Sequence, residues 1–353
     1  MILVVTPNPA VDVTYRVAEQ RIGETQRVLE VQRHPGGKGL NVGRVLAATG
    51  VPTHAVLPLG GDGGRWITHA LDDLGLVHTD VAVRGGTRTT VTVVDDLAHP
   101  TMFGEPGPVL SPDEWDTITA AVEQLLDGDV GRTGGADGAV GAAGTAGTAG
   151  APPAAALVVS GSLPRDTDPA VVARWVTAAR RHGVLSVVDC SGTALLAAAS
   201  AGATVCKPNR EELFEATGTD DERSGALRLL GLGATVVVVS RGSDGIAAHT
   251  AEHVLEVPAV PGVSGNPTGA GDAATAGLVG VLVEVLVGAG LPAPDGGIPA
   301  PDDATLLRAL RSAAAHGAAA VLQPVAGVVD SADVQRFLST PPAPAHDRTR
   351  TPV

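Results

Sequence analysis

Short apolar runs rich in β-branched residues alternate with helical stretches along most of the chain. Six of these runs are long enough to form buried strands, namely residues 2–6, 53–57, 156–160, 185–189, 204–207 and 235–240. Such alternation is typical of βαβ units and predicts an α/β fold, with a mostly parallel central sheet and helices on both of its faces. Ligands of these sheets bind beyond the carboxyl ends of the strands, so the residues that follow each run are the first candidates for chemistry.

Two segments, residues 12–33 and 87–103, instead alternate polar and apolar residues. This period of two predicts strands with one covered and one exposed face. We expect antiparallel strands that form a small accessory sheet. Such a sheet would be a lid over a cleft, a dimer contact, or both, and a homodimer formed through it would cover its free edges.

Two further segments have compositions that do not favour a packed structure. Residues 128–155 consist mostly of Gly, Ala and Thr, and residues 341–353 are rich in Pro and Arg. Neither segment can bury enough apolar surface to fix its backbone. We therefore expect a flexible inserted loop and a disordered tail.

The net charge and the aromatic content of the chain limit the classes of binding partner that we expect. The net charge is -14, and 2% of the residues are aromatic. Nucleic acids and anionic membranes attract proteins with a basic surface, and base stacking requires aromatic side chains. We therefore expect neither nucleic acid nor a membrane as a partner.

Three features favour a cytoplasmic location. The first strand, residues 2–6, lacks the basic flank of a signal peptide. The longest apolar stretch, residues 273–290, contains Glu284 and several glycines, and it fits a buried helix better than a membrane span. Cys190 and Cys206 lack the spacing of a metal site or a disulfide framework, which favours a reducing compartment.

The strongest chemical motif is Asn-Pro-Thr-Gly-Ala-Gly-Asp at residues 266–272, just before an alanine-rich helix. The small residues 269–271 let backbone N–H groups face an anion, and the helix adds the positive end of its dipole. Asp272 stands where a carboxylate can take a proton from an attacking hydroxyl, as in-line phosphoryl transfer requires. A plain helix start with turn and N-cap residues would explain the same motif.

A second motif is Pro-Gly-Gly-Lys-Gly-Leu-Asn at residues 35–41. It is not a Walker A loop, because Lys38 is followed by Gly and not by Ser or Thr. The paired glycines allow a small ligand to approach, while Lys38 and Asn41 offer donors to hydroxyl or phosphate oxygens. The alternative is a tight strand-to-helix turn with a solvated lysine.

A third motif, Lys-Pro-Asn-Arg-Glu-Glu, covers residues 207–212. Asn209 and Glu212 lie three apart on the first turn of a helix, so they share a face and could hold waters of a phosphate-bound Mg²⁺. A capping box would give the same spacing. The glycine-bearing turns at residues 160–164 and 239–245 also close apolar strands, where ligands of α/β sheets bind.

In this order the motifs resemble the PfkB carbohydrate kinases, in particular the branch of 1-phosphofructokinase, tagatose-6-phosphate kinase and minor 6-phosphofructokinase. The similarity covers most of residues 1–340 and includes an opening motif, Thr-Pro-Asn-Pro-Ala-Val-Asp, at residues 6–12. The resemblance implies a single domain over residues 1–340. Its fold would be a ribokinase-like three-layer α/β/α sandwich with a mostly parallel central sheet and a small β-sheet lid.

The resemblance also implies roles for individual residues. Asp272 would be the catalytic base, with the anion hole formed by Gly269, Ala270 and Gly271. The sugar would be bound by Asp12, Gly37, Lys38 and Asn41, and its existing phosphate by Arg88 and Arg27, because bidentate arginines suit phosphate. The nucleotide would contact Lys207, Asn209, Ser240, Gly242, Gly245 and His316. Glu212 would hold Mg²⁺ through water.

The implied reaction transfers a phosphoryl group from ATP, with Mg²⁺, to fructose 1-phosphate and yields fructose 1,6-bisphosphate. Tagatose 6-phosphate, fructose 6-phosphate or a free sugar remain alternatives, since Thr90 and Thr92 replace an Asn and a basic residue that are usual in the branch. A catalytically silent sugar-binding module is a different class. Retention of Asp272 beside residues 269–271 argues against it.

Overall fold

The computed structural model describes residues 1–95, 100–128, 153–288 and 298–339. The predicted insertion at 128–155 falls almost wholly outside these ranges, and so does the predicted tail at 341–353. Within the described ranges, none of the helices combines the length and apolarity needed to cross a bilayer.

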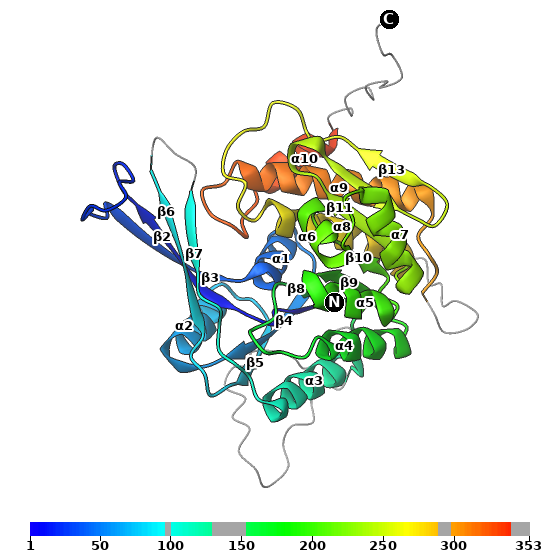
Figure 1. Cartoon of the computed structure of the whole chain (residues 1–353), viewed down its shortest axis with the longest axis horizontal. Helices are drawn as coiled ribbons and strands as arrows, with labels where there is room; N and C mark the ends of the chain where they lie inside the picture. The colour runs from blue at the N-terminus through cyan, green and yellow to red at the C-terminus, as the bar shows by residue number, and fades with distance from the viewer. Residues whose placement is uncertain (96–99, 129–152, 289–297, 340–353) are drawn as a thin grey trace, which may run out of the picture.

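The larger sheet of the described chain has nine strands (Figure 1) in the order β13-β12-β11-β10-β9-β8-β1-β4-β5. All neighbours from β5 to β11 are parallel, whereas β12 and β13 add an antiparallel edge. All six predicted runs form strands of this sheet, which confirms its mostly parallel character. The strand bounds are β1 Ile2–Val5, β4 Thr53–Leu59, β5 His78–Ala82, β8 Ala156–Ser160, β9 Leu185–Asp189, β10 Val205–Cys206, β11 Val236–Ser240, β12 Ile246–His249 and β13 Val254–Val257.

Helices cover both faces of this sheet because its strands are apolar on both sides. In β1, Leu3 and Val5 face a core with α3 to α7, whereas Ile2 and Val4 face a core with α1, α8, α9 and α10. This arrangement confirms the three-layer sandwich. The helix bounds are α1 Lys38–Ala48, α2 Gly61–Asp73, α3 Pro112–Leu126, α4 Ala170–Arg181, α5 Gly192–Ser200, α6 Arg210–Thr217, α7 Glu222–Leu232, α8 Ala270–Leu282, α9 Asp303–Val321 and α10 Ser331–Ser339.

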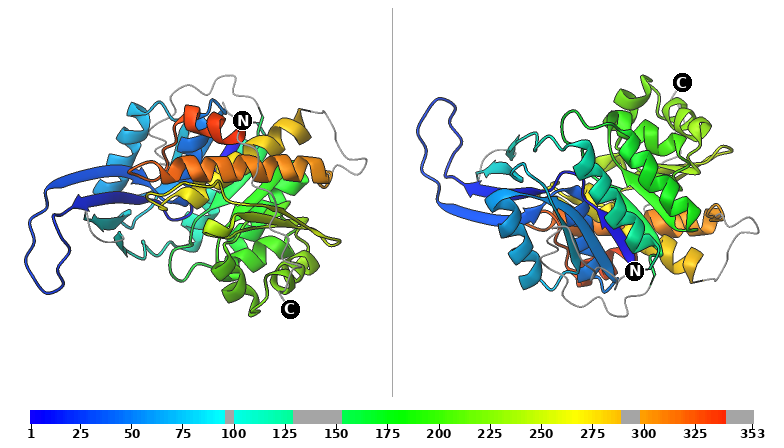
Figure 2. Two further views of the ribbon diagram at one scale, coloured as in Figure 1. Left: turned by 90° about the horizontal axis from the view of Figure 1, so that it is seen from above. Right: turned by 90° about the horizontal axis from the view of Figure 1, so that it is seen from below.

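The smaller sheet, called the lid below, projects from the body of the molecule (Figure 2). It has the strand order β3-β2-β6-β7. The antiparallel prediction is wrong for its central pair, because β2 and β6 run parallel. Between β3 and β6 the chain passes through α1, β4, α2 and β5. This crossover brings the chain back to the end of the lid at which β2 begins, so β6 runs in the same direction as β2. The bounds are β2 Ala10–Arg16, β3 Glu30–Gly36, β6 Arg88–Val94 and β7 Thr101–Gly104.

The two faces of the lid differ in chemistry. Val11 and Val13 of β2 pack with Ile67 and Leu71 of α2, which fixes one face to the body. Asp12 and Thr14 alternate with those valines and therefore lie on the other face. The lid thus presents polar side chains toward the carboxyl ends of the large sheet.

Candidate active site

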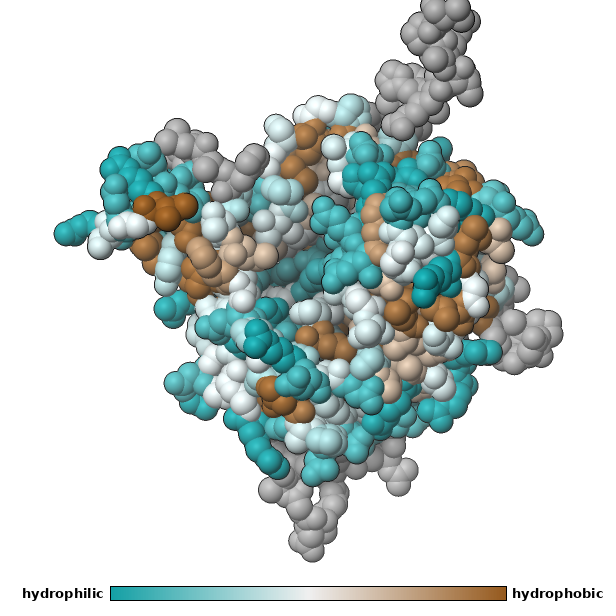
Figure 3. All heavy atoms as spheres, in the orientation of Figure 1, coloured by the Kyte–Doolittle hydropathy of each residue, from teal (hydrophilic) through white to brown (hydrophobic). Residues whose placement is uncertain are grey.

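A cleft of about 510 Å³ lies between the polar face of the lid and the carboxyl ends of the parallel strands. It appears in Figure 3 as a hollow with hydrophilic atoms between the lid and the body. Its lid side includes Asp12, Thr14, His34, Arg88, Thr90 and Thr92. Its body side includes Gly37, Lys38, Asn41, Asp189, Lys207, Asn209, Glu212, Ser240, Gly269, Gly271 and Asp272.

Asp272 lies on the first turn of α8 and is 6% exposed. Its Oδ2 accepts a hydrogen bond of 2.9 Å from Nδ2 of Asn41. Burial, reinforced by the nearby charge of Asp189, raises the pKa of Asp272 to about 7, although the hydrogen bond from Asn41 opposes this rise. A carboxylate with such a pKa accepts a proton readily near neutral pH, as a general base must.

The start of α8 leaves backbone N–H groups open to the cleft. Gly269 has a φ of 82°, and a side chain there would collide with Ala326, whose backbone lies 2.9 Å from the added Cβ. Gly271 has no atom within 4 Å of such a Cβ, so a ligand can approach its backbone. The N–H of Ala270 instead donates to the carbonyl oxygen of Pro267 at 3.2 Å. The N–H groups of Gly271 and Asp272 are therefore the better anion donors.

A network of opposite charges forms part of the body side of the cleft. Lys38 Nζ is 2.9 Å from Glu212 Oε1 and 3.6 Å from Asp189 Oδ1. Lys207 Nζ is 3.0 Å from Asp189 Oδ2, which also accepts a hydrogen bond from Thr275 at 2.8 Å. Asp189, followed by Glu212, raises the pKa of Lys38. Burial alone would raise the pKa of Asp189, but Lys207 and Lys38 hold it below its ordinary value.

Asp189 was missed as a candidate from the sequence. The signal was present in the sequence. Asp189 is the last residue of the buried strand β9, and Lys207 directly follows β10, which runs parallel to β9. Carboxyl ends of neighbouring parallel strands meet at one edge of a sheet. His34, which pairs with Asp12 across the lid and lines the cleft, was missed as well.

Asp12 and Arg88 form the lid side of the site. Burial raises the pKa of Asp12 to about 6, although Arg88 and Arg44 oppose the rise. Any side chain at Gly36 would overlap the Asp12 carboxylate, so the glycine makes room for it. Arg88 donates from Nε and Nη2 to the carbonyl oxygen of Asn8, at 3.2 and 3.1 Å, and from Nη1 to that of Glu105 at 3.0 Å. These bonds hold its guanidinium at the cleft edge.

Asn209 and Glu212 do form a capping box at the start of α6. Glu212 Oε2 accepts from the N–H of Asn209 at 2.9 Å, and Asn209 Oδ1 accepts from the N–H of Glu212 at 2.8 Å. Both residues nevertheless line the cleft. The helix cap therefore fixes the carboxylate beside Lys38. The capping box is confirmed, and the Mg²⁺-holding role stays a prediction.

Five predicted residues lie away from the described lining of the cleft. One is Ala270, whose N–H is hydrogen-bonded to Pro267. Gly242 and Gly245 lie in the turn after β11, where a side chain at Gly245 would overlap the carbonyl oxygen of Val257. Arg27 is exposed in the connection between β2 and β3. His316 lies on α9, is 8% exposed, and lines a different cavity. The structure thus gives Gly245 a packing role and does not bring His316 to the cleft.

The family model described as pfkB family carbohydrate kinase matches residues 6–103 and 149–331. The chain belongs to this family. Membership makes it an ATP-dependent sugar kinase, which confirms both the predicted family and the predicted class of enzyme.

Solved structures agree with the pfkB assignment. Phosphofructokinase-2 from Escherichia coli, in its tetrameric inhibited form, is 26% identical, with 96% of this chain and 97% of that chain covered and a TM-score of 0.76. A possible 1-phosphofructokinase from Thermotoga maritima is 21% identical, with 96% and 97% covered and a TM-score of 0.74. Ribokinase from Arabidopsis thaliana is 21% identical, with 96% and 99% covered and a TM-score of 0.66. The predicted ribokinase-like fold is confirmed.

Proposed function

We propose that this kinase transfers the γ-phosphoryl group of ATP to a hydroxyl of fructose 1-phosphate and forms fructose 1,6-bisphosphate. The observation that carries the proposal is that Asp272, the amides at the start of α8 and the lid arginine Arg88 all border one cleft. A base, an anion site and a phosphate-binding cation are the parts that phosphoryl transfer to a phosphosugar requires.

Asp272 acts as the base in this proposal. It takes the proton of the acceptor hydroxyl while that oxygen bonds to the γ-phosphorus and the bond to the ADP oxygen breaks. The N–H groups of Gly271 and Asp272 stabilise the charge on the transferred group. Lys38, held by Glu212 and Asp189, adds a fixed positive charge on the same side of the cleft.

The charges that line the cleft support a nucleotide that carries Mg²⁺. Among the described lining residues, four carboxylates face three lysine or arginine side chains, so the lining alone cannot neutralise two phosphate-bearing ligands. Asp189 and Glu212 supply the oxygen ligands that Mg²⁺ prefers, and Glu212 would hold the ion through water. When bound, the ion offsets charge on the nucleotide phosphates.

Lid residues would select the sugar. Arg88 keeps N–H groups beyond those given to Asn8 and Glu105, and these suit a phosphate. Asp12 would accept from sugar hydroxyls, and Thr90 and Thr92 on the same face of β6 would add hydroxyl donors. This polar lining supports a phosphosugar held under the lid.

Fructose 6-phosphate is the second candidate. Escherichia coli phosphofructokinase-2, which is 26% identical to this chain, has been solved in complex with fructose-6-phosphate. Tagatose 6-phosphate and free sugars complete the set to be compared. A silent binding module would bind these sugars without releasing ADP.

A coupled assay of ADP release tests the proposal. We expect fructose 1-phosphate to give the highest kcat/KM among fructose 1-phosphate, fructose 6-phosphate, tagatose 6-phosphate, fructose and ribose. A higher kcat/KM for another phosphosugar would show that this sugar, and not fructose 1-phosphate, is the acceptor. A higher value for a free sugar would remove phosphate recognition from the proposal.

We also propose that two copies associate through the lid. Val31 and Phe103 lie on the lid face opposite the cleft and are 51% and 61% exposed. Exposed apolar side chains on the open face of a small sheet are candidates for contact with a partner.

A further inference from the structure

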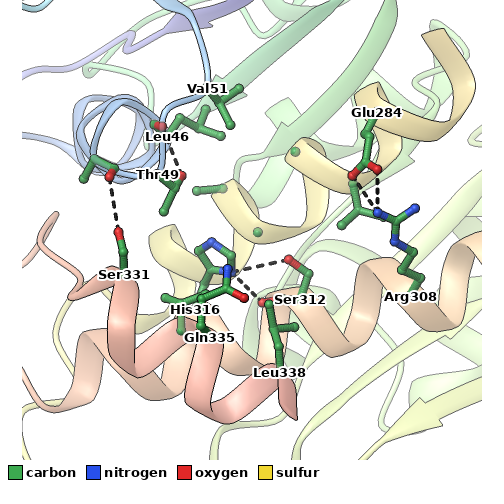
Figure 4. A pocket seen from close by; sticks show the side chains of 16 residues that line it. Leu46, Thr49, Val51, Glu284, Arg308, Ser312, His316, Ser331, Gln335 and Leu338 are labelled. Atoms are coloured by element: carbon green, nitrogen blue, oxygen red, sulfur yellow. Dashed lines mark hydrogen bonds and ion pairs between the residues drawn. The ribbon is translucent and has the colours of Figure 1, made fainter. Parts of the chain in front are cut away.

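A second cavity of about 500 Å³ lies between α1, α8, α9 and α10 (Figure 4). The apolar part of its wall includes Leu46 from α1, Val281 from α8 and Leu338 from α10. Gly280 of α8 adds open space, because a Cβ built there meets no atom within 4 Å. In the described chain, no residue lines both this cavity and the catalytic cleft.

His316 is the polar group at the centre of this cavity (Figure 4). Its Nδ1 lies 2.8 Å from the carbonyl oxygen of Ser312. A carbonyl oxygen can only accept, so Nδ1 carries the proton and Nε2 keeps a lone pair. Burial lowers the pKa of His316, which keeps the ring neutral.

The lone pair of His316 Nε2 is an unused acceptor. Among the described residues no group pairs with Nε2, and the atom is not sealed off from the cavity. Because this atom is accessible from the cavity and has a lone pair, a donor that enters the cavity can bond to it. A ligand with an N–H or O–H group would therefore complete the bonding of this ring.

The cavity offers no net charge to a ligand. Its described charged residues are Glu284 and Arg308, and they pair with each other at 2.6 Å. Both side chains are more than half exposed at the rim. An ionic ligand would find no unpaired counter-charge among these described residues, so an uncharged ligand is favoured.

We propose that this cavity is a second ligand site, which binds an uncharged ring compound carrying an N–H or O–H donor. The ring would lie against Leu46, Val281 and Leu338, and the donor would meet Nε2 of His316. A volume of about 500 Å³ is in the range of small-molecule sites. The proposal does not depend on the acceptor sugar, because it rests on residues outside the cleft.

Indole and benzofuran are matched probes, since both are flat bicyclic molecules of similar size and only indole has an N–H donor. Thermal unfolding of the full chain at increasing probe concentration reports binding as a rise in Tm. We expect indole to bind about tenfold more tightly than benzofuran, as one hydrogen bond allows. Equal affinities would overturn the role of His316, and no rise with either probe would overturn the site.

Three variants locate the binding and test the role of His316. Gly280→Leu fills the cavity and should abolish the rise, whereas Gly231→Leu, on an exposed part of α7 with equal open space, should leave it intact. His316→Asn keeps a donor for Ser312 but lacks Nε2, so it should reduce the preference for indole to near unity. An unchanged response in Gly280→Leu would place indole elsewhere and overturn the proposal. If His316→Asn fails to fold, the affinities of indole and benzofuran for the unchanged chain still test the role of His316.

Discussion

Asn41 and Asp272 are separated by 231 residues in the chain, yet the Asn41 amide donates to the Asp272 carboxylate at 2.9 Å inside the protein. Asn41 lies on α1, which leaves the lid, and Asp272 lies on α8, which leaves the carboxyl edge of the large sheet. The bond therefore ties the start of α1, which we propose binds the sugar, to Asp272, the proposed base. It also orients the carboxylate, because one of its oxygens is held and the other is left for a substrate.

The first prediction concerns this base. We expect Asp272→Asn to lower kcat by about 10²–10⁴-fold, since it removes the proton acceptor and keeps the shape of the side chain. Binding of ATP, measured by calorimetry, should change little. Asp113→Asn, on the exposed first turn of α3, is a matched control that should keep full activity. Undiminished turnover in Asp272→Asn would remove this residue from the chemistry.

The second prediction concerns pH. Asp272 must be ionised to act as a base and has a pKa of about 7, so kcat/KM should fall about tenfold per unit as the pH drops below that value. The Asn41 hydrogen bond lowers this pKa, so Asn41→Ala should move the acid limb of the profile to higher pH. A limb set by Asp12, whose pKa is about 6, would not move with Asn41. A pH–rate profile of both forms separates the two groups.

The sequence predicts six strands of the large sheet because these runs are largely apolar on both faces, and such runs are visible locally. β5, with the sequence His-Thr-Asp-Val-Ala, and the edge strands β12 and β13 were not among the predicted runs. The pairing of β2 with β6 is different. It depends on where the chain returns after α1, β4, α2 and β5, and no local pattern records that. The direction of a strand in the lid is therefore a property of the tertiary path.

The candidate site shows the same limit. Motifs place Asp272, Lys38 and Asn41 at the cleft because glycine-rich turns at the ends of strands are local signals. The position of His316 could not be predicted in this way. It depends on how α9 packs against Gly277 of α8, because this packing decides which side of α9 faces the cleft. The buried role of Asp189 is likewise visible only once Lys207 and Lys38 are seen around it.

The third prediction concerns the ion pair between Lys207 and Asp189, whose side chains are 2% and 3% exposed. Lys207→Met removes the nearer cation and leaves a buried carboxylate poorly compensated, so the free energy of unfolding should fall by about 3–5 kcal/mol. Arg174→Met breaks an exposed pair with Asp116 and should change stability by less than about 1 kcal/mol. Urea unfolding of both variants measures the difference. Equal small effects would show that the buried pair is dispensable.

The fourth prediction concerns Arg88. Because a charge-assisted bidentate contact contributes about 1.5–3 kcal/mol, Arg88→Ala should raise KM for the phosphosugar by about 10–100-fold and leave KM for ATP nearly unchanged. Arg88→Lys keeps the positive charge but cannot make the bidentate contact, so its KM for the phosphosugar should lie between those of the native chain and Arg88→Ala. The exposed Arg84→Ala is the control. If KM for the sugar does not change, Arg88 serves only to tie the lid to Asn8 and Glu105.

The fifth prediction concerns assembly. Val31 and Phe103 come from β3 and β7, at opposite edges of the lid, and share the face that points away from the cleft. If two lids pack face to face, a charge at either position would be buried without a partner, so Val31→Asp or Phe103→Asp should halve the mass measured by light scattering. Leu232→Asp places the same charge on an exposed leucine of α7 and should leave the mass unchanged. A native chain that is already monomeric at micromolar concentration would exclude the lid as an interface.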